Sequence, residues 1–253
     1  MKAIILAAGY GTRLVESAQN CDDKELKDLL TKTPKPLLPV YGKPLVEHTI
    51  GQLLKIGTVD EIIIVTNAKY FEQFEKWKKG FACCVKIKIL NDGTTSNETR
   101  LGAIKDIDLA ISLENINDTL LVIAGDNYVT FDIKKFAEFF KEKKSTVMAV
   151  RDIGDKTTAK KRFGVVEINE ENRIVGFEEK PEEPKTSLTA TAVYILRRDH
   201  IKLVQIYNEE NLEQDAPGFF LQWLHKKVDV YAWEFPADQY KDIGNLESYK
   251  GVI

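Results

Sequence analysis

A glycine-rich loop that contains an arginine follows the first apolar stretch of the chain. Residues 2–7, KAIILA, are followed by Gly9, Gly11, Thr12 and Arg13. A turn of this kind after a buried strand can present backbone amides to an anion. The guanidinium of Arg13 suits a polyphosphate because it is planar and always charged. The loop matches neither GxGxxG nor a P-loop, and a tight turn without a ligand is the alternative.

A lysine held between two prolines is the second candidate. Lys35 lies between Pro34 and Pro36 in TPKPLLPV, residues 33–40. Because proline fixes its own φ and restricts the residue before it, this lysine loses little conformational freedom when it binds an anion. We therefore consider Lys35 a phosphate-binding group, with an exposed lysine in an ordinary proline-rich loop as the alternative.

An aspartate follows a strongly apolar run. Residues 120–124, LLVIA, predict an interior strand, and Gly125 and Asp126 come at its carboxyl end, where ligands bind in open α/β sheets. Mg²⁺ in proteins is commonly held by one or two carboxylates together with phosphate oxygens. A helix cap is the alternative role, but Asp132 is better placed for it. We therefore predict that Asp126 binds a metal.

Two further charged stretches occur in the second half of the chain. Glu179 and Lys180 precede a proline in FEEKP, where they form either a surface charge cluster or a pair that binds a hydroxyl and a phosphate. Asp242, in YKDIGN, is a second candidate metal ligand if the chain returns to the same edge of the sheet. Neither stretch is sufficient by itself to indicate its role.

The elements that must position these residues alternate over the first 150 residues. Near-continuous apolar runs predict strands, and the amphipathic patterns between them predict helices. This alternation is typical of a doubly wound, mostly parallel sheet, so we expect an α/β, Rossmann-like fold of three layers. Strands are expected at residues 2–7, 61–66, 85–90, 119–124 and 146–151, and helices at 44–57, 69–80, 99–111 and 132–144.

The pattern changes beyond residue 150. Residues 163–181 predict two short strands around a turn, and strand and helix patterns follow at 189–201 and 216–235. We expect a mixed, partly antiparallel extension that folds over one mouth of the sheet. No linker is visible, so we predict a single domain, 1–253, with halves at 1–150 and 151–253.

The segment 15–33 separates the glycine loop from Lys35. It is polar and charged, with one short amphipathic piece at residues 25–30. A solvated excursion is one interpretation, and a mobile flap beside a bound NTP, between the two phosphate-binding segments, is the alternative.

The composition argues against several classes of partner. The net charge of the 253-residue chain is −3, so binding to nucleic acid or to a membrane surface is not expected. No apolar run approaches the ~18 residues that span a bilayer. The apolar stretch at the start is too short for a signal peptide, and we expect a cytoplasmic location. The three cysteines and three histidines show no metal-ligand spacing.

Together and in this order, LAAGYGTRL, TPKPLLPV, AGD, FEEKP and DIGN resemble the sugar-1-phosphate nucleotidyltransferases, above all the glucose-1-phosphate thymidylyltransferases and related NDP-sugar pyrophosphorylases. The resemblance extends over the whole chain. It implies that Arg13 and Lys35 act in catalysis and that Asp126 and Asp242 bind Mg²⁺. The implied nucleotide site consists of Leu6, Ala8, Gly9, Gly11, Thr12, Arg13 and Gly102, and the implied sugar-phosphate site of Gly164, Glu179, Lys180 and Thr191.

Three features depart from the family pattern. The span from Arg13 to Lys35 is longer than usual. Residues 91–104, NDGTTSNETRLGAI, replace the family's QPxPxGLAQA pattern and lack its glutamine, and Thr191-Ala192 stands where the family has TG. The preferred base and the preferred sugar are therefore left open.

The implied reaction is nucleotidyl transfer, in which a sugar-1-phosphate oxygen attacks the α-phosphorus of an NTP and pyrophosphate leaves. A phosphate nucleophile is already ionised at neutral pH, so positioning and charge stabilisation would account for catalysis. The alternatives are a cytidylyltransferase for a non-sugar alcohol phosphate and a non-catalytic regulatory subunit that binds a nucleotide sugar. Whether the chain forms a homo-oligomer does not follow from the motifs.

Overall fold

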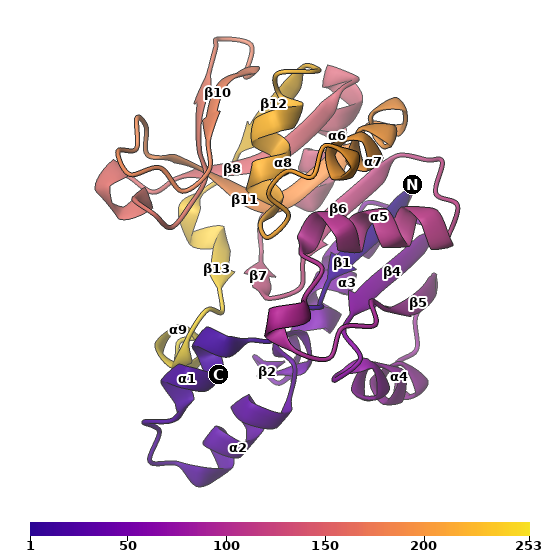
Figure 1. The fold of residues 1–253 in the computed structure, drawn as a ribbon, viewed down its shortest axis with the longest axis vertical. Coiled ribbons are helices and arrows are strands. Elements are labelled where there is room, and N and C mark those ends of the chain that lie inside the picture. Colours follow the sequence, from indigo (N-terminus) through magenta and orange to yellow (C-terminus); the bar gives the residue numbers. More distant parts are fainter.

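The computed structural model describes residues 1–253, and its main feature is a nine-stranded sheet (Figure 1). Four strands run parallel in the order β6-β1-β4-β5, with β1 paired to both β6 and β4. The remaining strands are mixed: β11 is antiparallel to β6, β8 and β9, β9 is antiparallel to β10, and β12 is parallel to β8. The bounds are β1 (Lys2–Leu6), β4 (Glu61–Thr66), β5 (Lys86–Asn91), β6 (Leu120–Ala124), β8 (Thr146–Asp152), β9 (Val165–Ile168), β10 (Ile174–Glu178), β11 (Leu188–Leu196) and β12 (Val230–Glu234).

Side chains that alternate along each strand enter two separate cores. Ala3 and Ile5 of β1 belong to a core covered by α3, α4 and α6, whereas Ile4 belongs to a core covered by α5, α7 and α8. The expected three-layer α/β arrangement is therefore confirmed, and no helix is long and apolar enough to cross a bilayer. The helix bounds are α3 (Leu45–Lys55), α4 (Phe71–Gly80), α5 (Ala103–Leu113), α6 (Ile133–Lys143), α7 (Lys202–Glu209) and α8 (Pro217–Leu224).

Two local expectations differ from the structure. The helix expected at 99–111 begins only at Ala103, because Gly102 has φ 91° and ψ 156°, which is not a helical conformation. The boundary placed at residue 150 falls inside β8, a strand that pairs on both sides, so the sheet continues through it. The cap expected at Asp132 is confirmed, since its Oδ1 accepts hydrogen bonds from two amides of α6.

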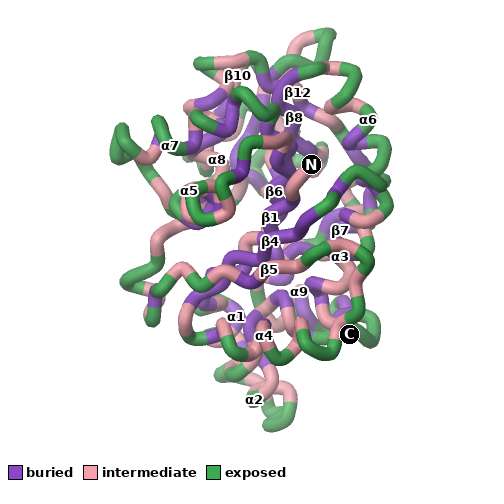
Figure 2. The backbone as a smooth tube through the Cα atoms, turned by 90° about the vertical axis from the view of Figure 1, so that its right-hand side faces the viewer, coloured by how far each residue is buried: buried purple, intermediate pink, exposed green.

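The segment 15–33 is exposed or half-buried over most of its length, as its polarity suggested, but it is not an irregular loop. It folds into most of α1 (Thr12–Ala18) and into α2 (Lys24–Lys32), although α2 is largely exposed at one end of the molecule (Figure 2). A few apolar residues account for this structure: Leu14, Ala18 and Leu30 form a third core with α9 (Leu246–Lys250) and with the hairpin of β2 (Pro39–Val40) and β3 (Lys43–Pro44).

Candidate active site

The site residues predicted from the sequence all line a single cleft. The cleft has a volume of about 750 Å³ and lies at the carboxyl ends of β1 and β6, where ligands bind in parallel sheets. Its walls come from both halves of the chain. The mixed part of the sheet therefore contributes one side of the site and the parallel part contributes the other.

The glycine loop at residues 8–13 presents unused backbone donors to the cleft. None of its amides donates a hydrogen bond to another backbone group. The loop is nevertheless held firmly, because Asn67 Nδ2 donates to the Ala8 carbonyl at 2.8 Å and the Tyr10 hydroxyl lies 2.9 Å from Thr94 Oγ1. A rigid loop with free amides is prepared to accept the oxygens of a phosphate chain.

Lys35 lies almost buried beside this loop. Its side chain is 10% exposed, and its Nζ is 3.5 Å from Asp126 Oδ2. The stem of Lys35 passes over Gly11, and the ring of Pro36 packs against Gly125, where an added Cβ would lie 3.0 Å from it. The flanking proline therefore fixes the lysine against the end of β6, as its sequence context suggested.

Asp126 and Asp242 come together through a small two-stranded sheet. Asp126 immediately precedes β7 (Asn127–Val129), which pairs antiparallel with β13 (Tyr240–Asp242). Beyond β13, the amide of Ile243 donates to the carbonyl oxygen of Asp126 at 3.1 Å. Two carboxylates that are more than a hundred residues apart in the sequence are thus neighbours in the cleft.

The electrostatics of this pair fit a divalent cation. Burial raises the pKa of Asp242, and the negative charge of Asp126 raises it further, while Lys35, Arg13 and Arg151 oppose the increase. A cation held by both carboxylates would remove their repulsion, and carboxylate oxygens are suitable ligands for Mg²⁺. No third acidic, histidine or cysteine ligand joins them, so phosphate oxygens and water would complete the coordination.

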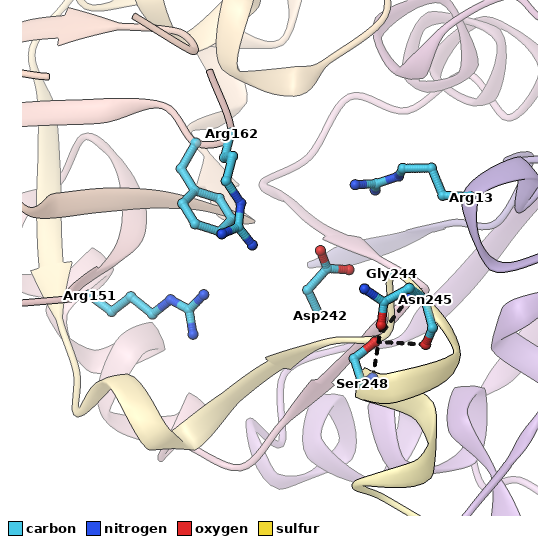
Figure 3. A pocket seen from close by; sticks show the side chains of 8 residues that line it. Arg13, Arg151, Arg162, Asp242, Gly244, Asn245 and Ser248 are labelled. Atoms are coloured by element: carbon cyan, nitrogen blue, oxygen red, sulfur yellow. Dashed lines mark hydrogen bonds between the residues drawn. The ribbon is translucent and has the colours of Figure 1, made fainter. Parts of the chain in front are cut away.

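Arginines surround Asp242 where the cleft opens to solvent (Figure 3). The guanidinium groups of Arg13 and Arg151 point toward Asp242 from opposite sides, and Arg162 lies near them. Arg151 is fixed, because its Nη1 donates to the carbonyl oxygen of Tyr240 at 2.7 Å, and burial lowers its pKa. Arg13 and Arg162 are exposed. Such a cluster is suited to a polyanion.

Sequence reasoning missed Arg151 and Arg162. The signal for Arg151 was available, since it lies near the carboxyl end of a strand, the same position that drew attention to Asp126. Arg162 had a weaker signal, its position two residues before Gly164. Neither residue belongs to a recognisable motif, so their place in the site emerges only from the folded chain.

The opposite wall of the cleft contains a buried glutamate enclosed by glycines. The side chain of Glu179 is 7% exposed, and a Cβ at Gly164 or Gly218 would collide with its carboxylate. Burial raises the pKa of Glu179, while the charge of Lys180, with Nζ at 3.9 Å from Oε1, opposes this. The Thr191 hydroxyl also lines the cleft, but it donates to the Ala149 carbonyl at 2.7 Å and is not a free donor.

The last region of the cleft lies between residues 92–106 and residues 213–217. A Cβ at Gly102 would lie 2.5 Å from the carbonyl oxygen of Gln214, so the two segments touch there. Arg100 Nε also donates to Asp215 Oδ1 at 2.8 Å. These two contacts hold the two segments together across this region of the cleft.

Residues 2–252 match the model of a family described as "Nucleotidyl transferase". The chain therefore belongs to the nucleotidyl transferase family, which confirms the family assigned from the motifs.

The chain is also similar to individual members of this family. The chain is 28% identical over 263 residues to the glucose-1-phosphate adenylyltransferase of Clostridium novyi, covering 98% of this chain but only 64% of that protein. It is 28% identical over 250 residues to the D-glycero-alpha-D-manno-heptose 1-phosphate guanylyltransferase of Campylobacter jejuni, covering 98% of this chain and 97% of that protein. A crystal structure of UDP-glucose pyrophosphorylase with UDP-glucose matches with a TM-score of 0.75 at 22% identity, covering 99% and 96% of the two chains, and shows the same fold.

Proposed function

We propose that the protein joins an NTP and a sugar-1-phosphate to give an NDP-sugar and pyrophosphate, with Mg²⁺ as its cation and the cytoplasm as its location. The observation that carries the proposal is the order of groups along one cleft. Free loop amides and Lys35 lie on one side, Glu179 and Lys180 lie on the other, and Asp126 and Asp242 stand between them. This order fits two anionic substrates that meet at a metal site.

The chain's own residues account for the positioning of both substrates. The amides of residues 8–13 and the Arg13 guanidinium bind the triphosphate, and Lys35 holds the α-phosphate near Asp126. Lys180 binds the phosphate of the sugar, so the nucleophilic oxygen stays near the α-phosphorus despite the repulsion of two anions. Asp126 and Asp242 hold the cation, which, when bound, neutralises charge on the phosphates.

Selection of a sugar phosphate rests on Glu179. Its carboxylate lies inside the cleft without a direct hydrogen-bond partner, while its backbone amide donates to Gln222 Oε1 at 2.7 Å and fixes the residue. A buried acceptor of this kind binds the hydroxyls of a sugar, since each hydroxyl is a donor. Two relatives are named for sugar-1-phosphates, which supports the same substrate class.

Pyrophosphate release tests the proposal. Purified protein is incubated with Mg²⁺, each of the common NTPs and a panel of sugar-1-phosphates, with phosphocholine and inositol phosphate in parallel. Release with a sugar-1-phosphate supports the proposal. Release only with CTP and an alcohol phosphate supports the cytidylyltransferase alternative instead. Nucleotide-sugar binding without release in any mixture supports the regulatory alternative.

A further inference from the structure

An acidic side chain without a partner lies in the region of the cleft between residues 92–106 and residues 213–217. Asp106 belongs to the first turn of α5, is 5% exposed and lines the cleft. Its Oδ1 is buried and accepts no hydrogen bond. A buried carboxyl group without partners is unfavourable and is usually found hydrogen-bonded. The folded chain therefore leaves an unsatisfied carboxyl group in the lining of the cleft, and a rotation of this side chain can present it to the donors of a ligand.

A second acceptor lies nearby. Asp92 also lines the cleft, and its Oδ1 accepts from the Thr94 amide at 2.7 Å and the Thr94 hydroxyl at 2.8 Å, while its Oδ2 is buried and unpartnered. Burial and the charge of Asp92 together raise the pKa of Asp106 to about 8. Thr94 in turn contacts Tyr10. Asp92 is thus connected through Thr94 to the glycine loop at residues 8–13.

Donors and apolar walls complete this end of the cleft. The amides of Gly102 and Ala103, at the start of an eleven-residue helix, donate to no backbone acceptor. The side chains of Leu6 and Ala103 are apolar parts of the lining, as required for the faces of a flat ring, and Asn97 adds a carboxamide. This region therefore combines the carboxylate acceptors with free backbone donors, and it has apolar side chains in its lining.

We propose that Asp106 recognises the base of the nucleotide and selects guanine. Guanine is the base that carries a ring N–H and an exocyclic amino group side by side, with a carbonyl oxygen next to them. The two donors match the two oxygens of Asp106 when its carboxyl group is ionised, and donation from the bound base favours the ionised form because it stabilises the charge. The carbonyl of the base matches the free amides at the start of α5. Uracil and thymine place carbonyl oxygens on both sides of one N–H, so an oxygen would face the carboxylate. The inference rests on the proposed function, because it assigns the base of the same NTP.

Nucleotide binding tests the assignment without catalysis. Isothermal titration calorimetry with GDP, ADP, CDP and UDP in the presence of Mg²⁺ should show tightest binding for GDP. Asp106→Asn should weaken GDP binding by about 100-fold, because the amide presents a donor to a donor. The same variant should bind xanthosine diphosphate more tightly than GDP, since that base has a carbonyl in place of the amino group.

A neighbouring aspartate provides the matched control. Asp108 lies on the same helix but accepts a hydrogen bond from Asn208 Nδ2 at 2.9 Å, away from the cleft. Asp108→Asn should leave the order of nucleotide affinities unchanged. Circular dichroism of both variants checks that each is folded.

The outcomes separate this inference from the function on which it rests. If no nucleotide binds and no pyrophosphate is released, the proposed function fails. If nucleotides bind and react but UDP, ADP or CDP binds best, or Asp106→Asn weakens all of them equally, only the guanine assignment fails. Exchange of preference from GDP to xanthosine diphosphate supports the assignment, because a purely structural role for Asp106 would not produce it.

Discussion

Asp242 lies against Asp126 because Asp242 pairs with Asn127 in the β13–β7 ladder and the next residue, Ile243, hydrogen-bonds the Asp126 carbonyl. Both carboxylates line the cleft, and Lys35 reaches Asp126 at 3.5 Å. Without a cation, two like charges oppose each other in a partly buried site, and the pKa of Asp242 is raised first by burial and then by the charge of Asp126. This relationship makes the pair the first target for mutation.

Asp126→Asn and Asp242→Asn should each reduce kcat by ~100-fold or more while the protein remains folded. The double variant should be little worse than either single variant, because groups that act as a unit are not additive. Steady-state kinetics with titrated Mg²⁺ measures both effects. Asp238→Asn, an exposed aspartate just before β13, is the control and should behave like the wild type. A fully active Asp242→Asn enzyme with unchanged Mg²⁺ dependence would falsify the paired-ligand role.

Arg13→Ala should lower kcat by ~100-fold with a smaller loss of NTP affinity, because the guanidinium stabilises charge that develops during transfer. Arg13→Lys should recover little of this loss, since lysine lacks the planar fork. Single-turnover kinetics and nucleotide titration separate the two effects. Arg198→Ala is the control, because Arg198 follows Leu196, which pairs with Leu120 at the opposite end of β6. A loss of NTP affinity with kcat unchanged would assign Arg13 to binding alone.

Gly218→Ala should raise KM for the sugar phosphate by ~10-fold or more and change KM for the NTP much less. The added methyl group would overlap the Glu179 carboxylate and displace it from its place in the cleft. Gly51→Ala is the matched control, since Gly51 is exposed within α3 with no atom near an added Cβ. That control should raise the free energy of unfolding by about 0.5–1 kcal/mol. An unchanged KM in Gly218→Ala would show that Glu179 does not contact the sugar.

The stability of the unliganded protein should respond to Asp106 in a pH-dependent way. Its pKa is about 8 in the folded chain and about 3.9 when unfolded. The native state therefore binds the extra proton between these values. The stability associated with this group is complete below pH ~4 and is lost as the pH rises through ~8. Asp106→Asn should raise Tm relative to the wild type by at least ~2 °C more at pH 9 than at pH 5.

Differential scanning fluorimetry at the two pH values measures this difference. Asp108→Asn serves again as the control and should shift Tm equally at both. An Asp106→Asn effect that is the same at pH 5 and pH 9 would mean that Asp106 is already ionised throughout this range.

Local pattern was sufficient to identify the parallel half of the fold. Strands such as 61–66 contain a continuous apolar run, IIIV at residues 62–65, because both faces of the sheet are covered. The residue types therefore indicate this burial directly. The residues that touch phosphate in the proposed site also lie in short, continuous motifs. The loop at 8–13 and Lys35 need only a strand end, a turn and two prolines, which are local features.

Only the tertiary structure decided which distant residues meet. The partnership of Asp126 with Asp242 depends on pairing between β7 and β13, and no local pattern specifies the register of two three-residue strands. Arg151 and Asp106 look like ordinary residues of a strand and a helix until the folded chain places them on the cleft. The segment 15–33 is polar because only Leu14, Ala18 and Leu30 anchor it and its flanks. Half of their partners, Ile243, Tyr249 and Val252, lie at the other end of the chain. The sequence determined the elements and the motifs through local preference, whereas the convergence of charges required long-range packing.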